Sequence, residues 1–119
     1  VKQFIEPVYN TKLLFVYDTD FLVAEDYLNK KNIRVNLITC TGQTGNYVVK
    51  NKKGEQKRYY MYLEKDKNQI QNLVHEISHL VFLSLKDCGI RVTEETNEIF
   101  AYYFDWWFKK LYPLVITKT

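Results

Sequence analysis

The feature that most constrains this chain is the segment Leu73 to Leu80, LVHEISHL, which contains the pattern His-Glu-x-x-His at His75, Glu76 and His79. These are the only two histidines among 119 residues. On an α-helix, residues four positions apart lie on the same face one turn apart, so both imidazoles can reach one metal ion. Glu76 is next to the first histidine and is a candidate general base. The pattern therefore predicts a helix that binds zinc.

Apolar residues accompany the histidine pair at helical spacing. At about 100° per residue they form one stripe roughly opposite the pair. Its members are Ile70, Leu73, Val74, Ile77, Leu80 and Val81. A lone histidine on a helix is usually a packed or solvated side chain, but the pair, the intervening glutamate and the opposed stripe together favour a metal site.

Length and composition are those of a small globular protein. The chain is 46% hydrophobic and 16% aromatic and contains only four Gly and two Pro, which argues against a disordered segment. A chain of 119 residues can bury roughly two thirds of its unfolded surface and form its own core. We therefore expect a single domain over residues 1–119.

Cysteine and lysine positions restrict the other possible sites. Cys40 and Cys88 are too few and too isolated for a disulfide framework or a Cys-x-x-Cys metal site, so free thiols are expected. A Lys-rich segment over residues 50–67 concentrates positive charge. Nucleic acid is one possible partner for it, but no stacking motif accompanies the lysines, which favours the solvated tip of a hairpin.

The chain before this Lys-rich segment predicts alternating strands and one helix. Residues 12–17 form an apolar run typical of a strand, and residues 21–31 predict a helix with Thr19 or Asp20 as its N-cap. Residues 33–39 predict a second strand. A loop with Gly42 and Gly45 is expected over residues 40–46.

A hairpin is predicted to lead into the zinc-binding helix. Residues 47–50 and 57–64 are its β-prone strands, and Asn51 and Gly54 supply the turn. The string Asp66-Lys67-Asn68-Gln69 has the form of a capping box, which places the start of the helix near Lys67. Gly89 predicts its end.

A second long helix is expected after the zinc-binding helix, with Thr93 as its N-cap and its end near Tyr112, before Pro113. Its apolar stripe contains Ile99, Phe100, Tyr103, Phe104, Trp107 and Leu111, and its polar face contains Glu98, Tyr102 and Asp105. If both helices pack their apolar sides on a common sheet with their polar faces toward each other, Glu98 lies near the histidine pair. Glu98 is therefore the predicted third ligand.

The order of these features resembles the gluzincin metallopeptidases: HEISH, eighteen residues, then Glu98 in the string NEIFAYYF. The resemblance covers residues 57–107 and is greatest to small phage-encoded zinc peptidases that have an HExxH helix, a short Gly-containing turn and an E-x-F-A-Y helix. It implies an α+β, zincin-like fold. In such a fold a sheet of three to four strands packs against the HExxH helix, a following Glu-bearing helix and one N-terminal helix.

The chain departs from the family pattern beyond Glu98. Many gluzincins carry an Asp four residues after the ligand Glu to orient a zinc-bound histidine, whereas this chain has Tyr102 there, so Asp105 is the candidate for that role. Family members that cleave repressors place the acidic ligand earlier, which leaves Glu95 and Glu94 as alternative ligands.

The resemblance implies zinc-dependent hydrolysis of a peptide or protein substrate. Zn²⁺ held by His75, His79 and Glu98 would keep a position for water and lower its pKa to about 7, and Glu76 would accept the proton. Tyr102 is a candidate for stabilising the oxyanion. The strand at residues 57–64 is a candidate for holding an extended substrate if it lies at the sheet edge.

Two other functions stay open. One is a non-catalytic, zinc-stabilised phage structural or host-interaction protein, although a structural site has no need of Glu76. The other is nucleic-acid binding through the Lys-rich segment. No run of about 18 apolar residues could span a membrane, and residues 1–7 lack the apolar core of a signal peptide. We therefore expect no membrane partner and a cytoplasmic location, in the host cell or the virion if the chain is phage-encoded.

Overall fold

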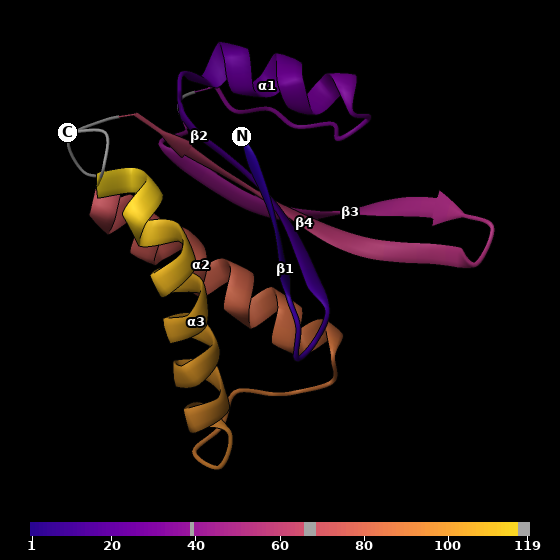
Figure 1. Cartoon of the computed structure of the whole chain (residues 1–119), viewed down its shortest axis with the longest axis vertical. Coiled ribbons are helices and arrows are strands. Elements are labelled where there is room, and N and C mark those ends of the chain that lie inside the picture. Colours follow the sequence, from indigo (N-terminus) through magenta and orange to yellow (C-terminus); the bar gives the residue numbers. More distant parts are fainter. Residues whose placement is uncertain (39, 66–68, 117–119) are drawn as a thin grey trace.

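The computed structural model describes residues 1–38, 40–65 and 69–116 and has the predicted α+β architecture. One sheet in the order β1-β2-β4-β3 is covered by three helices (Figure 1). The strands are β1 (Lys2–Glu6), β2 (Thr11–Thr19), β3 (Gly42–Asn51) and β4 (Gly54–Glu64). The helices are α1 (Phe21–Lys30), α2 (Gln69–Asp87) and α3 (Asn97–Ile116).

The sheet is mixed. β2 and β4 run parallel at its centre, since the connection between them passes through α1 and β3. β1 and β3 pair antiparallel on the two outer sides. Because β4 lies between β2 and β3, residues 57–64 cannot add a substrate strand, and the outer strand that contacts α2 is β3.

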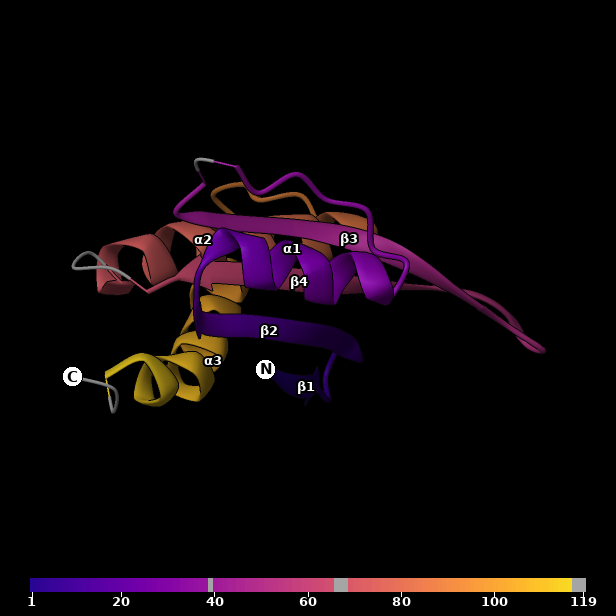
Figure 2. The ribbon, with the colours of Figure 1, turned by 90° about the horizontal axis from the view of Figure 1, so that it is seen from above.

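Side chains of β2 and β4 alternate between two apolar cores, because successive residues of a strand point to opposite faces. The core between the sheet and the pair α2 and α3 includes Leu13, Phe15, Met61, Leu63, Leu73, Ile77, Leu80, Trp107 and Leu111. The core beneath α1 includes Leu14, Val16, Tyr60, Tyr62, Ala24, Leu28, Ile33 and Leu37. Helix α1 therefore lies on the opposite face of the sheet from α2 and α3 (Figures 1 and 2).

Both predicted helices before residue 90 form at the expected positions. Asp20 caps α1 by accepting a hydrogen bond of 2.9 Å from the Val23 N–H, and Asn32 follows the helix with φ of 63°. Helix α2 ends at Asp87, and Gly89 follows it with φ of 80°, a value that favours glycine. The capping-box residues 66–68 lie outside the described residues.

The strand predicted over residues 33–39 is wrong. Two side-chain oxygens of α1 accept hydrogen bonds from backbone N–H groups of this segment: Asn29 from Val35 and Glu25 from Leu37, each at 3.3 Å. Backbone donors satisfied in this way need no strand partner, so residues 33–38 are irregular. Residue 39 is outside the described ranges.

The loop predicted over residues 40–46 is also wrong for most of its length, because β3 begins at Gly42. Gly45 permits this pairing, since an added Cβ would lie 2.8 Å from ring atoms of Tyr60. The hairpin turn follows the prediction. Asn51 accepts a hydrogen bond of 2.8 Å from the Lys53 N–H, and Gly54 has φ of 117°.

Strand β1 was not among the predicted elements. It is joined to β2 by a turn that the buried Glu6 holds, because its carboxylate accepts hydrogen bonds from the backbone N–H groups of Val8 and Tyr9. Its five residues, KQFIE, do not alternate between apolar and polar and so give little strand signal; the pairing with β2 stabilises the segment.

Both predicted ends of α3 are wrong. Thr93 caps the preceding turn, where its hydroxyl accepts a hydrogen bond of 3.2 Å from the Glu95 N–H. The helix begins one turn later at Asn97. It continues through Pro113 to Ile116, because Val115 beyond the proline is buried in the core.

Candidate functional site

Helix α2 presents His75 and His79 to solvent on one face. Their Nε2 atoms lie 3.1 Å apart, and the two rings are nearly perpendicular at 82°. Two nitrogens bound to one tetrahedral Zn²⁺ at about 2.0–2.1 Å would lie roughly 3.3 Å apart. The imidazole pair therefore fits a shared zinc ion with only a small adjustment.

Glu76 lies on a different side of the same helix and is only 5% exposed. The Thr44 hydroxyl on β3 donates a hydrogen bond of 2.7 Å to its Oε1 atom. The same hydroxyl lies 3.3 Å from the Glu76 backbone carbonyl, so Thr44 contacts both the side chain and the helix. A charge-assisted hydrogen bond of this length holds a carboxylate in one orientation.

Gly42 provides the space for the Glu76 carboxylate. A Cβ atom at this position would lie 2.9 Å from both Cγ and Oε2 of Glu76. Any larger residue would therefore push the carboxylate or the strand aside. Gly42 and Thr44 were not predicted as site residues because residues 40–46 were predicted to form a loop. The only signal in the sequence was the pair of glycines, Gly42 and Gly45, which can also indicate close approach of another segment to the backbone.

A tyrosine on β4 adds to the polar surroundings of β3. The Tyr60 hydroxyl donates a hydrogen bond of 2.8 Å to Oε1 of Gln43. Burial raises the pKa of Tyr60, and the charges of Cys40 and Glu76 raise it further. The hydroxyl thus stays protonated at neutral pH and acts as a donor.

Glu98 lies in the first turn of α3 and is exposed. Figure 1 shows α2 and α3 diverging toward this end of α3. Among residues 1–38, 40–65 and 69–116, no group of three His, Cys, Asp or Glu side chains is arranged to hold a metal ion. The alternatives Glu94 and Glu95 are exposed in the turn before α3.

The two other polar residues of α3 have separate surroundings. Tyr102 is 72% exposed and lines a pocket of about 350 Å³ together with Glu6, Val8, Tyr9, Ile99, Tyr103 and Trp106. This pocket is lined by none of the three HExxH residues. Asp105 forms an ion pair of 3.0 Å with Lys109 one turn along the helix.

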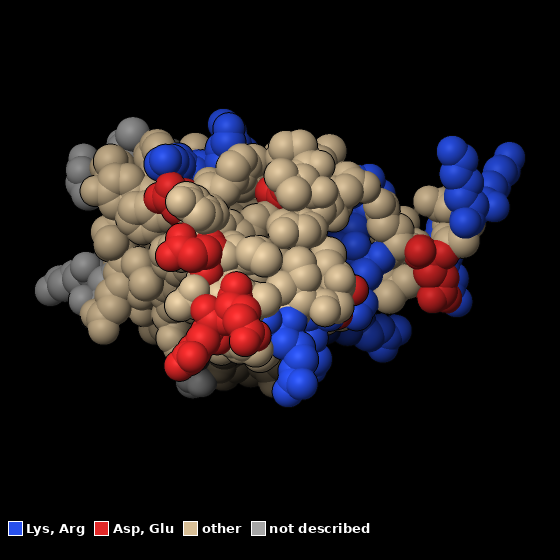
Figure 3. All heavy atoms as spheres, turned by 90° about the horizontal axis from the view of Figure 1, so that it is seen from below, with Lys and Arg blue, Asp and Glu red and all other residues tan. Residues whose placement is uncertain are grey.

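Charged side chains are unevenly distributed on the surface. Figure 3 shows Lys and Arg side chains at the tip of the β3–β4 hairpin, which projects from the body of the molecule. Lys50, Lys52 and Lys53 are all exposed there, and Lys50 lies 3.8 Å from Glu55. The predicted hairpin tip is confirmed.

In the part of the chain that the structure describes, no helix combines the length and apolar character needed to cross a membrane. Comparisons with known proteins yield no similarity: no family model, no curated protein and no solved structure matches the chain. Function is therefore inferred from the residues of α2, β3 and α3 themselves.

Proposed function

We propose that this protein is a zincin-like zinc metallopeptidase in which His75 and His79 hold Zn²⁺ and Glu76 is the general base. The observation that carries the proposal is that the two histidines and the glutamate of one helix segment have different surroundings. The two imidazoles face solvent with their Nε2 atoms 3.1 Å apart, whereas the carboxylate between them is buried and oriented by Thr44. A purely structural metal site has no use for such an oriented carboxylate.

The residues have distinct roles in this mechanism. When bound, Zn²⁺ would supply the Lewis acidity that polarises a peptide carbonyl and lowers the pKa of a water molecule toward neutral pH. Glu76 accepts a proton from the attacking water and returns it to the nitrogen that leaves. Thr44 keeps Oε1 of Glu76 in place during both transfers. The outer edge of β3, next to Glu76, offers backbone groups to an extended peptide.

Glu98 is the proposed third ligand, and Tyr102 the proposed donor to the oxyanion. Glu98 forms no ion pair within the described ranges, so its exposed side chain is free to change rotamer. Ligation by Glu98 also requires the first turn of α3 to approach α2. Metal binding supplies free energy for such an adjustment, because coordination and folding are coupled.

The deciding experiment replaces Glu76 by Gln, which has nearly the same shape but cannot accept the proton. Zinc content should be retained, while cleavage of a peptide library should fall on the order of 10²-fold to 10⁴-fold. Glu55→Gln, at an exposed acid near the tip of the β3–β4 hairpin, is the matched control and should cleave as wild type does. If wild type binds zinc but cleaves nothing that Glu76→Gln spares, the site is a non-catalytic zinc module that ties helices together.

A second candidate function, nucleic-acid binding, is favoured by one observation, the exposed lysines on the projecting hairpin tip (Figure 3). Contacts between lysines and phosphates weaken steeply as salt rises. Binding of a single-stranded or duplex oligonucleotide that falls with salt and is lost in Lys52→Glu/Lys53→Glu would support this function. No binding at low salt would exclude it.

A further inference from the structure

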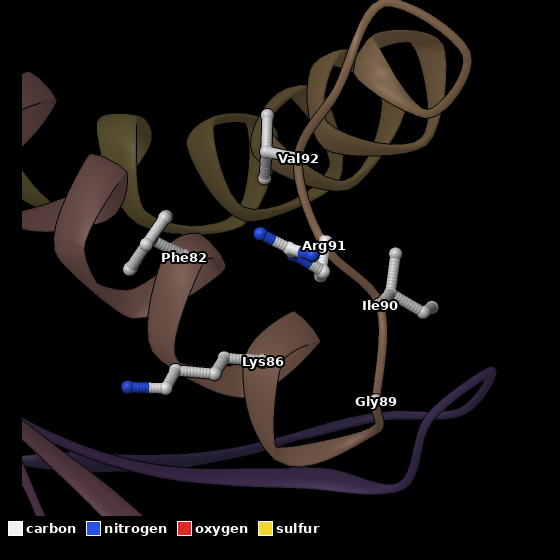
Figure 4. Close-up of a pocket in the computed structure, with 6 residues that line it drawn as sticks. All are labelled: Phe82, Lys86, Gly89, Ile90, Arg91 and Val92. Atoms are coloured by element: carbon white, nitrogen blue, oxygen red, sulfur yellow. The ribbon is translucent and has the colours of Figure 1, made fainter.

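A second site lies along α2 beyond the histidine pair. It is a pocket of about 340 Å³ between the C-terminal half of α2 and the segment that leads toward α3. The lining residues are Phe82, Lys86, Gly89, Ile90, Arg91 and Val92, and we call it the Phe82–Arg91 pocket (Figure 4). Gly89, with φ of 80°, reverses the chain after α2. Figure 4 shows the Arg91 side chain extending from this returning segment toward α2.

The pocket and the histidine pair share one face of α2. At about 100° per residue, His75, His79, Phe82 and Lys86 fall within a sector of roughly 60°. All four side chains are exposed. With a rise of about 1.5 Å per residue, Phe82 lies about 4.5 Å and Lys86 about 10.5 Å beyond His79 along the helix axis. A polypeptide bound at the histidine pair can therefore reach the pocket.

The pocket combines apolar walls with positive charge that lacks a partner. Phe82 is 51% exposed and Val92 41% exposed, which are large values for apolar side chains that line one pocket. Lys86 and Arg91 form no ion pair with any acidic residue in the described segments, whereas Lys57 nearby pairs with Asp87 at 3.2 Å. An occupant with a carboxylate and apolar atoms would satisfy both features at once.

We propose that the Phe82–Arg91 pocket binds an acidic residue of the polypeptide substrate together with an apolar neighbour. Rising at about 3.3 Å per residue, an extended chain covers the distance from His79 to the pocket in about one to three residues. The acidic residue thus lies one to three positions from the bond that is cleaved. This inference rests on the proposed peptidase function, because it defines the position of the acid relative to that bond.

Cleavage specificity tests the pocket directly. Wild type should favour library peptides with Asp or Glu at one position within three residues of the cut. The double variant Lys86→Glu/Arg91→Glu should lower kcat/KM for these peptides by about 10-fold or more, mostly through KM, and favour Lys or Arg there instead. Lys30→Glu/Lys31→Glu, the same charge change at the C-terminal end of α1 on the opposite face of the sheet, should leave the preference unchanged. An equal effect of the control would reduce the result to general electrostatics and overturn the proposal.

A binding measurement separates failure of the pocket from failure of the peptidase. Glu76→Gln, which should cleave on the order of 10²-fold to 10⁴-fold more slowly than wild type, is titrated into fluorescein-labelled peptides that differ only in a central Leu-Glu-Leu, Leu-Gln-Leu or Leu-Lys-Leu, and their anisotropy is recorded. Tightest binding of the Glu peptide, lost with Lys86→Glu/Arg91→Glu and weakened with Phe82→Ala, supports the pocket even if wild type cleaves nothing. Equal binding of all three peptides overturns the pocket even if wild type is an active peptidase. A competition experiment at 150 mM salt tests nucleic acid as the occupant. If a single-stranded oligonucleotide displaces the Glu peptide at a lower concentration than unlabelled peptide does, the proposal is overturned.

Discussion

The Thr44 hydroxyl on β3 lies 2.7 Å from Oε1 of Glu76 on α2, and this hydrogen bond ties the outer strand of the sheet to the carboxylate between the two histidines. The other carboxylate oxygen, Oε2, faces Gly42 on the same strand. Both oxygens of Glu76 are therefore positioned by β3. Reactivity at the histidine pair should depend on this strand as much as on the helix.

Removal of the Thr44 hydroxyl should reduce activity without removing zinc. Thr44→Val keeps the shape but leaves a buried carboxylate oxygen short of a donor, which costs about 1.5–3 kcal/mol of unfolding free energy. We expect kcat to fall about 10-fold with KM little changed, as measured with a cleaved peptide at equal zinc content. Thr44→Ser retains the hydroxyl and should restore most of the activity. Equal losses in Val and Ser variants would contradict a role for the hydrogen bond.

Gly42→Ala should displace the Glu76 carboxylate, because the new Cβ would lie 2.9 Å from its Cγ and Oε2 atoms. Overpacking of this kind costs about 1–3 kcal/mol. A double-mutant cycle with Glu76→Ala measures the contact: in the Glu76→Ala background the same glycine change should cost little, since the clashing atoms are gone. If the losses of unfolding free energy from Gly42→Ala and Glu76→Ala, measured by urea denaturation, are additive, the added Cβ does not clash with Glu76.

The histidine variants should lose metal while remaining folded. His75 and His79 are both exposed, so alanine at either position removes little packing. Without one imidazole, tight zinc binding should disappear, and chelator should no longer lower the melting temperature. Elemental analysis and thermal unfolding with and without chelator measure both effects. Full zinc occupancy in both variants would remove the metal-site assignment.

The zinc affinity of three variants tests which acidic residue near or on α3 is the third ligand. Glu98→Ala should release zinc, and Glu95→Ala should not, if Glu98 is the third ligand. Asp105→Asn should weaken zinc by about 10-fold to 100-fold if Asp105 orients a ligand. Asp105 is paired with Lys109 at 3.0 Å, so Lys109→Met is the control for loss of that ion pair. A release by Glu95→Ala alone would move the ligand to the turn before the helix.

Stability should fall at alkaline pH because burial raises the pKa of three tyrosines, Tyr59, Tyr60 and Tyr103. Burial and the hydrogen bond to Asp87 raise the pKa of Tyr59 well above its usual value, and burial also raises the pKa of Tyr103. Above the unfolded pKa of about 10, the folded state holds more protons than the unfolded state, so the unfolding free energy decreases as pH rises. The full contribution is present below about pH 10.

Urea denaturation between about pH 8 and 11 measures this slope. Tyr59→Phe should flatten the decrease above about pH 10, since phenylalanine has no proton to lose in the unfolded state and only Tyr60 and Tyr103 still contribute. Tyr102→Phe, at a tyrosine that is 72% exposed, is the control and should keep the wild-type slope. A Tyr59→Phe slope as steep as that of wild type would contradict the assignment.

The sequence by itself determined those helices and turns whose capping residues, turn residues or apolar periodicity lie within the element itself. The apolar stripe opposite the histidine pair predicts α2, and four of its six members are buried there, whereas Ile70 and Val74 are exposed. Gly89 ends the helix through its left-handed backbone. Asp20 likewise begins α1 by capping its first turn. The β3–β4 hairpin turn follows from Asn51 and Gly54. Each of these depends on neighbouring residues only, so periodicity and capping rules predict them.

Tertiary structure alone decided what surrounds the histidine pair. Thr44 and Gly42 reach Glu76 across 32 and 34 positions of the chain, because β3 pairs with β4 and packs beside α2. The direction of α3, and with it the location of Glu98, follows from burial of Trp107 and Leu111 against the sheet rather than from the cap at Thr93. Burial free energy is shared by residues distant in sequence, so no local pattern reports which side chains it brings together.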